Sequence, residues 1–130
     1  MEIINKSHEE IKSNKREKLG VYLGIRNNKE INISAGATME YGLAPGLFMH
    51  VVNDEDKWFI YFDNDCDGFL LNERKGKNAV FVFDASLIRL FCKRTHHQIP
   101  CKFQLKLTGA KQNGHHLIEI LHHTPLEDYV

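Results

Sequence analysis

Residues 58–62 have the sequence Trp-Phe-Ile-Tyr-Phe, and residues 48–52 have the sequence Phe-Met-His-Val-Val. Every residue of 58–62 is aromatic or β-branched, and these side-chain types have the highest β-propensity. The polar run Asn-Asp-Glu-Asp at 53–56 separates the two segments and is typical of a turn. Together these residues predict two neighbouring strands and, with them, a β-rich fold.

The chain before this pair has the pattern of a hairpin followed by a short helix. Apolar side chains alternate with other types over residues 19–25 and again over residues 30–34. Residues 26–29 between them include two asparagines, which tolerate turn conformations. Ser34 can cap a short helix over residues 35–41. We therefore expect strand, turn, strand and helix ahead of the central pair.

The chain after this pair repeats the order of elements. Strands are expected at 69–71, 79–83, 102–107 and 117–121, with turns at 74–78 and 109–114. Asp84 or Ser86 is expected to cap a helix after the second of these strands. The apolar side chains of this helix fall on one face at i, i+4 spacing, namely Leu87, Ile88, Phe91 and Cys92.

The sequence thus predicts a mostly β (α+β) fold with about eight short strands and two short helices. Residues 19–62 and 69–121 follow the same order of elements, so one hypothesis is two ββαββ halves that form a single-chain pseudo-dimer. The halves are not alike in sequence, and a chance repeat of the pattern is the alternative. We expect one domain over 19–123, a polar N-terminal arm over 1–18 and a tail over 124–130.

The composition is that of a globular protein, with 42% hydrophobic and 26% charged residues in 130. The longest apolar run falls well short of the ~20 residues of a membrane span. Residues 1–18 lack the apolar centre of a secretory signal, so we expect a soluble cytoplasmic protein. Its three cysteines, Cys66, Cys92 and Cys101, are expected to be reduced.

Charge is segregated along the chain although the net charge is zero. Residues 12–29 carry six basic side chains against Glu17 alone, and residues 74–111 carry nine against Asp84 alone. Residues 53–73 carry seven acidic side chains against Lys57 alone. An anionic partner would respond to such local fields, whereas a scattered, solvated surface is the alternative interpretation.

Three segments carry a family resemblance, and they are Ile31-Asn32-Ile33-Ser34, Tyr41-Gly42-Leu43-Ala44-Pro45-Gly46 and Phe48-Met49-His50-Val51-Val52. In this order they resemble the core of the AbrB/MazE-like (SpoVT-AbrB) swapped-hairpin DNA-binding family over residues 29–62. That family has a short strand, a helix ending near Leu-Gly, a glycine turn and two strands. It usually has Arg before the first Ile, Pro at the place of Ser34 and Asp at the place of Leu47, and this chain departs at all three.

The resemblance implies a dimer, or here a pseudo-dimer, that contacts DNA through basic hairpin loops. Both expected turns are basic, which supports this interpretation. The nucleic-acid-binding residues predicted on the two turns are Arg26, Lys29, Arg74, Lys75 and Lys77. The alternative is a protein-interaction or structural domain that forms a homodimer or binds another protein through a strand edge or an apolar patch.

Four groups of residues could carry other chemistry. The run 63–68 has carboxylates and a glycine at the first positions of a calcium loop, but Arg74 stands where the bidentate Glu belongs. Cysteine and histidine at 92, 96, 97 and 101 match no common zinc spacing. The pairs His115-His116 and His122-His123 flank the last strand, where adjacent side chains point to opposite faces. Aromatic residues of 58–62 could stack bases, although core packing is the more ordinary role.

No spacing in the sequence identifies an enzyme class. We therefore expect a binding protein that is not an enzyme and has no catalytic residues, no metal and no cofactor. The preferred hypothesis is a nucleic-acid-binding module, with a DNA-binding transcriptional regulator as its specific form.

Overall fold

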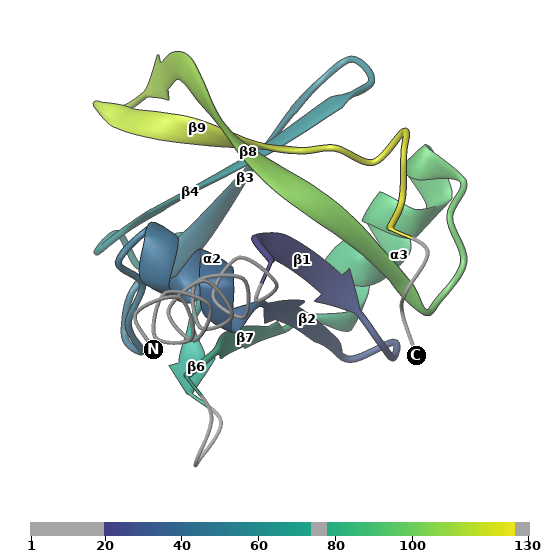
Figure 1. Ribbon diagram of the computed structural model, residues 1–130, viewed down its shortest axis with the longest axis horizontal. Coiled ribbons are helices and arrows are strands. Elements are labelled where there is room, and N and C mark those ends of the chain that lie inside the picture. The colour runs from purple at the N-terminus through teal and green to yellow at the C-terminus, as the bar shows by residue number, and fades with distance from the viewer. Residues whose placement is uncertain (1–19, 74–77, 127–130) are drawn as a thin grey trace, which may run out of the picture.

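The computed structural model describes residues 20–73 and 78–126 (Figure 1). Its elements in chain order are β1 (Tyr22–Ile25), β2 (Glu30–Ile33), α2 (Ala35–Glu40), β3 (Phe48–Asp54), β4 (Lys57–Asp63), β5 (Phe69–Leu70), β6 (Asn72–Glu73), β7 (Val80–Phe83), α3 (Ala85–Thr95), β8 (Cys101–Gln112) and β9 (His115–Ile120). The described chain is therefore mostly β with two short helices, which confirms the predicted fold class.

The strands form an antiparallel sheet in the order β5-β3-β4-β9-β8-β1-β2-β7-β6. All eight predicted strands are present. The ninth is β6, which directly follows the strand expected at 69–71 and was not predicted. In Figure 1, β1, β2, β7 and β6 form a lower layer, and β3, β4, β8 and β9 cross above it. The core lies between the two layers.

Two connections join the layers and nearly close the sheet into a barrel. On one side β8 pairs with β1 through its first four residues and with β9 farther along. On the other side Leu71 joins β5, which pairs with β3, to β6, which pairs with β7. The N–H of Leu71 donates to the carbonyl of Leu47 (2.8 Å), and its carbonyl accepts from the N–H of Gly46 (3.1 Å). The Leu71 side chain is buried, so the crossing point is itself part of the core.

The strand pairing has the two-fold pattern that the pseudo-dimer hypothesis predicts. If the broken strand β5–β6 is matched with β1, then β7, β8 and β9 match β2, β3 and β4. When β5 and β6 are counted as one strand that closes the sheet into a ring, this exchange maps the strand order onto itself. The ladders β2·β7 and β4·β9 each join one half to the other. Strands of each half therefore have backbone hydrogen-bond partners in the other half.

Both helices begin at the predicted caps. The Ser34 side chain accepts from the N–H of Ala37 at the start of α2, and Asp84 accepts from the N–H of Leu87 at the start of α3. These bonds satisfy N–H groups that a helix leaves without an internal partner. The two helices lie on opposite sides of the molecule (Figure 1).

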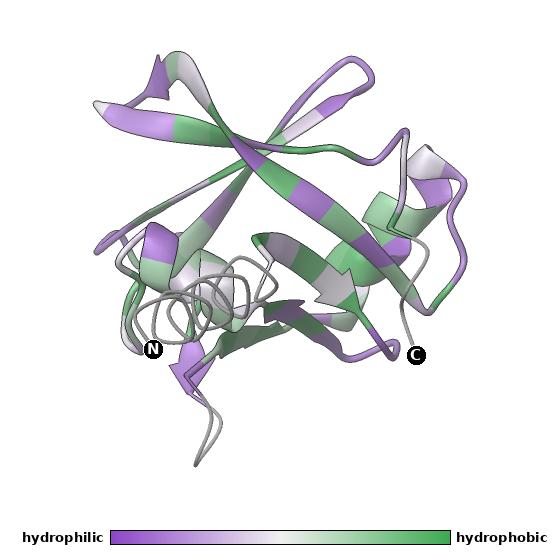
Figure 2. Cartoon of the chain, viewed as in Figure 1, coloured by the Kyte–Doolittle hydropathy of each residue, from purple (hydrophilic) through white to green (hydrophobic). Residues whose placement is uncertain are grey.

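The core is built from the alternating apolar residues of the strands. Along β8, Phe103 and Leu105 are buried, whereas Gln104 between them and Lys106 after them are exposed, and Figure 2 shows this alternation in hydropathy. Trp58 is 3% exposed, and its ring lies edge-on to Phe91 of α3 at 5.0 Å. The Phe91 ring contacts Phe103 in turn. These three rings attach α3 to β4 and β8.

The last hairpin differs from the prediction. The sequence predicts a turn at 109–114, but β8 continues to Gln112 after a register shift between Leu107 and Lys111. The turn is Asn113-Gly114, and both residues have positive φ, 51° and 81°. An Asn-Gly pair favours this two-residue turn. The bulge lets the strand bend, so Gly109 does not end it.

We expect Trp58→Ala to lower the free energy of unfolding by about 3–5 kcal/mol, because it empties the contact between β4 and α3. Urea denaturation followed by far-UV circular dichroism measures this. Tryptophan fluorescence cannot be used, because Trp58 is the only tryptophan and the variant lacks it. The control is Leu90→Ala, which removes a side chain that is 41% exposed on α3 and should change stability little. Equal effects of the two variants would contradict this packing of Trp58.

Candidate functional site

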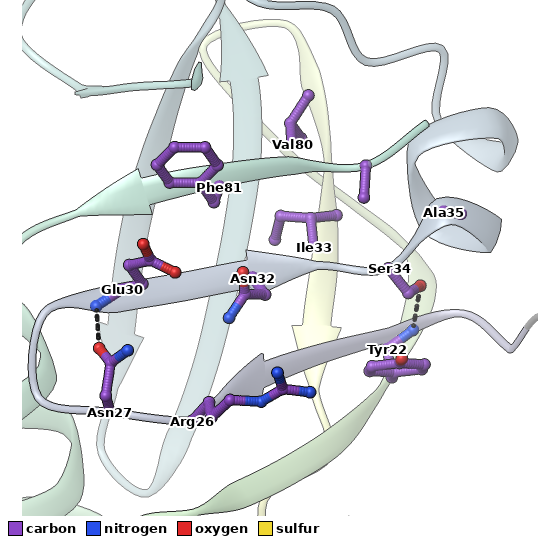
Figure 3. A pocket seen from close by; sticks show the side chains of 11 residues that line it. Tyr22, Arg26, Asn27, Glu30, Asn32, Ile33, Ser34, Ala35, Val80 and Phe81 are labelled. Carbon is purple, nitrogen blue, oxygen red and sulfur yellow. Dashed lines mark hydrogen bonds between the residues drawn. The ribbon is translucent and has the colours of Figure 1, made fainter. Parts of the chain in front are cut away.

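A groove of about 480 Å³ lies on the outside of the lower layer, across β1, β2 and β7 (Figure 3). Its polar lining includes Arg26 and Asn27 from the β1–β2 turn and Asn32 from β2. Aromatic side chains border it, Tyr22 on β1 and Phe81 on β7. The groove thus combines cationic, amide and aromatic groups on one surface.

Ser34 fixes the corner of the groove where β2 meets α2. Besides capping α2, its hydroxyl accepts from the N–H of Tyr22 (3.0 Å) and donates to the carbonyl of Gly20 (2.9 Å). The side chain is buried, so these three bonds have little competition from water. They hold the start of β1 against the end of β2, and so they fix the position of Tyr22.

The basic turn between β1 and β2 is held by Asn27. Its side-chain oxygen accepts from the N–H of Lys29 (2.9 Å) and from the N–H of Glu30 (3.0 Å). Arg26 and Lys29 are both exposed. Figure 3 shows Arg26 extended along β1 towards Tyr22, so the turn delivers its guanidinium into the groove.

The structure therefore places two of the predicted residues, Arg26 and Lys29, at one end of the groove. The other three, Arg74, Lys75 and Lys77, lie outside the described residues. They fall between β6 and β7 in the sequence, and β7 begins at Val80. In the β2·β7 ladder Val80 pairs with Ile33, whereas the Arg26 turn lies next to Glu30 at the opposite end.

A lysine of β8 extends the site beyond β1. Lys102 pairs with Gly24, and its ammonium lies over the Tyr22 ring, 4.5 Å from the centroid. Farther along the same face of β8, Lys106 is exposed. The residues predicted from the sequence include neither these lysines nor Tyr22 and Phe81. The available signal was the alternation itself, because residues between core positions on a strand must point outward.

Acidic residues gather elsewhere. One acidic run occupies the β3–β4 turn and another the loop between β4 and β5, and Figure 1 shows the β3–β4 turn far from the β1–β2 turn. Among the described residues that line the groove, only Glu30 is acidic. The acidic turn between β3 and β4 and the basic turn between β1 and β2 are therefore separated in space as well as along the chain.

A second cluster joins β3, β4 and β9. The rings of His50, Tyr61 and His115 stack in a row, with centroids 4.6 Å and 5.8 Å apart. One oxygen of Asp63 lies 2.6 Å from Nε2 of His50, and the other lies 3.7 Å from Nε2 of His115. The Asn113 amide donates to the Tyr61 hydroxyl (3.2 Å). These contacts fasten the tip of the β8–β9 hairpin to β4.

The pKa of Asp63 is lowered from its ordinary value. The largest cause is the N–H of Asp65, which donates to the carboxylate (2.9 Å). His50 and His115 lower it further, and partial burial acts in the opposite direction. Gly68 packs on the other side of His50, since an added Cβ would meet the ring at 2.9 Å. The sequence offers no sign of this cluster, because it depends on the cross-strand register.

The candidate metal ligands are mostly engaged in other contacts. In the described part of the chain only Asp65, Cys66 and Asp67 bring ligand atoms together, and all three are exposed. Their loop lies between two strands and turns through its own Asp–backbone hydrogen bonds. An acidic turn explains this segment without an ion.

The Cys and His residues near the end of α3 also have structural partners. Burial, followed by the neighbouring Cys92, raises the pKa of Cys101 to about 12. Nε2 of His97 lies 2.6 Å from the carbonyl of His122, and Nε2 of His122 contacts the carbonyl of Asp56. A carbonyl can only accept, so both ring nitrogens donate. These histidines hold the chain after β9 against α3 and the β3–β4 turn.

Trp58 and Tyr61, considered above for base stacking, are 3% and 6% exposed. Phe59 and Phe62 of the same strand are partly exposed, and Phe83 on the lower layer is exposed at 58%. Neither α2 nor α3 is long and apolar enough to cross a membrane, and the described residues contain no other helix. No family model, curated protein or solved structure matches the chain.

We expect Ser34→Ala to destabilise the fold by about 1–3 kcal/mol, because it removes a cap and leaves buried backbone groups without a partner. Ser86→Ala is the matched control, since Ser86 is exposed and its hydroxyl accepts one long hydrogen bond (3.3 Å) from the exposed Arg89 side chain. Thermal melts compare the two. A control as unstable as Ser34→Ala would show that the corner bonds contribute little.

The lowered pKa of Asp63 predicts a pH dependence. Folding favours the charged carboxylate, so its stabilisation is complete above the unfolded pKa of about 3.9 and is lost as pH falls through the lower folded pKa. Asp63→Asn should therefore flatten the fall in Tm below about pH 4. Asp67→Asn removes a charge from the same loop as a control. If both variants keep the wild-type profile, the carboxylate of Asp63 does not couple to folding.

Proposed function

We propose that this chain is a cytoplasmic nucleic-acid-binding module that contacts phosphates through the β1–β2 turn and the outer side of the lower layer. The observation that carries the proposal is the groove itself. Arg26 enters it from a turn that Asn27 holds in place, and Lys102 lies beyond it on β8. Acidic runs occupy other loops.

Phosphate recognition needs cations whose positions are set in advance. A guanidinium offers several N–H donors in a fixed plane, and it binds phosphate with two parallel hydrogen bonds. Lys29 adds a second exposed charge in the same turn. The amides of Asn27 and Asn32 supply neutral donors and acceptors between the charges.

The two-fold pattern of strand pairing supports a larger contact. Under the exchange of halves, the segment between β6 and β7 is the counterpart in chain order of the turn between β1 and β2. Its basic residues Arg74, Lys75 and Lys77, predicted from the sequence, would add phosphate contacts. This arrangement agrees with the basic hairpin loops that the AbrB/MazE-like resemblance implies, with a DNA-binding regulator as its specific form.

The test is binding of duplex and single-stranded DNA at two salt concentrations, measured by electrophoretic shift. We expect Arg26→Ala/Lys29→Ala to weaken binding and to make the salt dependence shallower by about one for each phosphate that no longer meets a cation. The matched control is Arg89→Ala/Lys93→Ala, which removes the same two residue types from the exposed side of α3.

If both double variants weaken binding equally, net charge alone explains the loss and the β1–β2 turn is not a specific phosphate contact. Failure to bind either form of DNA at low salt would rule out the proposal and favour the protein-interaction alternative, which predicts no salt-dependent binding of nucleic acid.

A further inference from the structure

The outward side chains of the lower layer form a continuous surface. Residues directly opposite each other in an antiparallel ladder share a face of the sheet. The registers therefore give one row across five strands, and its members are Asn72, Phe81, Asn32, Gly24 and Lys102. Tyr22 and Phe83 lie on the same side of β1 and β7, two positions from Gly24 and Phe81. We call this surface the outer face.

Phe83 is unusual in leaving an aromatic ring in water. It is 58% exposed, whereas Val80 and Val82 of the same strand are buried and supply its share of the core. Its ring meets Phe81 edge-on, with centroids 4.8 Å apart and planes at 86°. The two rings thus present an apolar platform that the packing of the fold does not require.

A difference between the two halves accounts for the position of Phe83. In the first half the capping residue Ser34 directly follows the buried Ile33. In the second half Phe83 is inserted between the buried Val82 and the capping residue Asp84. The extra residue points outward, and so the platform exists in one half only.

The basic turn lies beside this platform. Phe83 pairs with Glu30, and the N–H of Asp84 donates to the carbonyl of Lys29 (3.1 Å). Across the sheet, Lys102 lies over Tyr22. The outer face therefore presents aromatic rings on β7 and β1, Glu30 and Asn32 on β2 between them, and Lys102 on β8. These four strands span about 14 Å at the usual strand spacing.

We propose that the outer face binds single-stranded nucleic acid, with a base stacked on Phe83 and phosphates at Arg26, Lys29 and Lys102. This inference rests on the proposed function and specifies its ligand. Stacking on aromatic side chains needs bases whose faces are open, which a single strand offers and a duplex does not. The lysine and arginine side chains match a polyanion better than an apolar protein surface.

The experiment measures fluorescence anisotropy of the full chain with a labelled oligo(dT) of about 12 nucleotides, within the range of ~4–16 for one small β-barrel domain. The same strand annealed to oligo(dA) is the duplex probe. We expect the single strand to bind at least about tenfold more tightly. Phe83→Ala should weaken single-strand binding by about 5- to 100-fold without changing the salt slope, because stacking releases no counterions.

Two control variants isolate the role of the ring. Phe83→Tyr keeps an aromatic face and should retain binding. Leu90→Ala removes another exposed apolar side chain, 41% exposed on α3, and should leave binding unchanged. Lys102→Ala should make the salt slope shallower by about one, which Phe83→Ala should not.

The outcomes separate this inference from the proposed function. If neither probe binds at low salt, both fail. If the duplex binds as well as the single strand and Phe83→Ala behaves like Leu90→Ala, the single-strand inference fails and the proposed function stands. If Phe83→Ala changes only the oligomeric state, seen by size-exclusion chromatography with light scattering, the platform is a protein contact and the inference is overturned.

Discussion

The burial of one face of every strand is the constraint on which the rest of the structure depends. An alternating strand has an apolar side that must leave water, and a sheet of such strands achieves this most completely by closing on itself. Here closure requires β8 to pass from one layer to the other and Leu71 to join the opposite edges. Four ladders, β2·β7, β4·β9, β1·β8 and β3·β5, then join the halves, so neither half can bury its apolar face alone.

Closure also decides what remains outside. Once Val80 and Val82 face the core, the residues between and after them on β7 must face solvent, and the same rule exposes Asn32 on β2 and Lys102 on β8. The Ser34 hydroxyl then fixes β1 against α2, and Asn27 fixes the turn between β1 and β2. The candidate site is thus a rigid surface supported by the core, which is the arrangement that lowers the entropy cost of binding.

The polar clusters divide the molecule by charge and by role. Asp63 with His50 and His115 stabilises the far hairpin, and His97 and His122 secure the chain after β9. These groups are engaged in structural contacts on the upper layer and beside α3. The cations of the β1–β2 turn and Lys102 near the start of β8 lie by the outer face of the lower layer, away from the acidic turn between β3 and β4. A polyanion would therefore approach from that side.

The sequence by itself determined the eight strands, the caps Ser34 and Asp84, and the basic turn, because alternation, capping and turn chemistry act over a few residues. It predicted Arg26 and Lys29 as site residues and the repeated order of elements. Only the tertiary structure decided which strands pair, where β8 bends, and that Phe83 lies beside Lys29. The physical reason is that a side chain's exposure depends on register and closure, which join residues far apart in the chain and leave no local pattern.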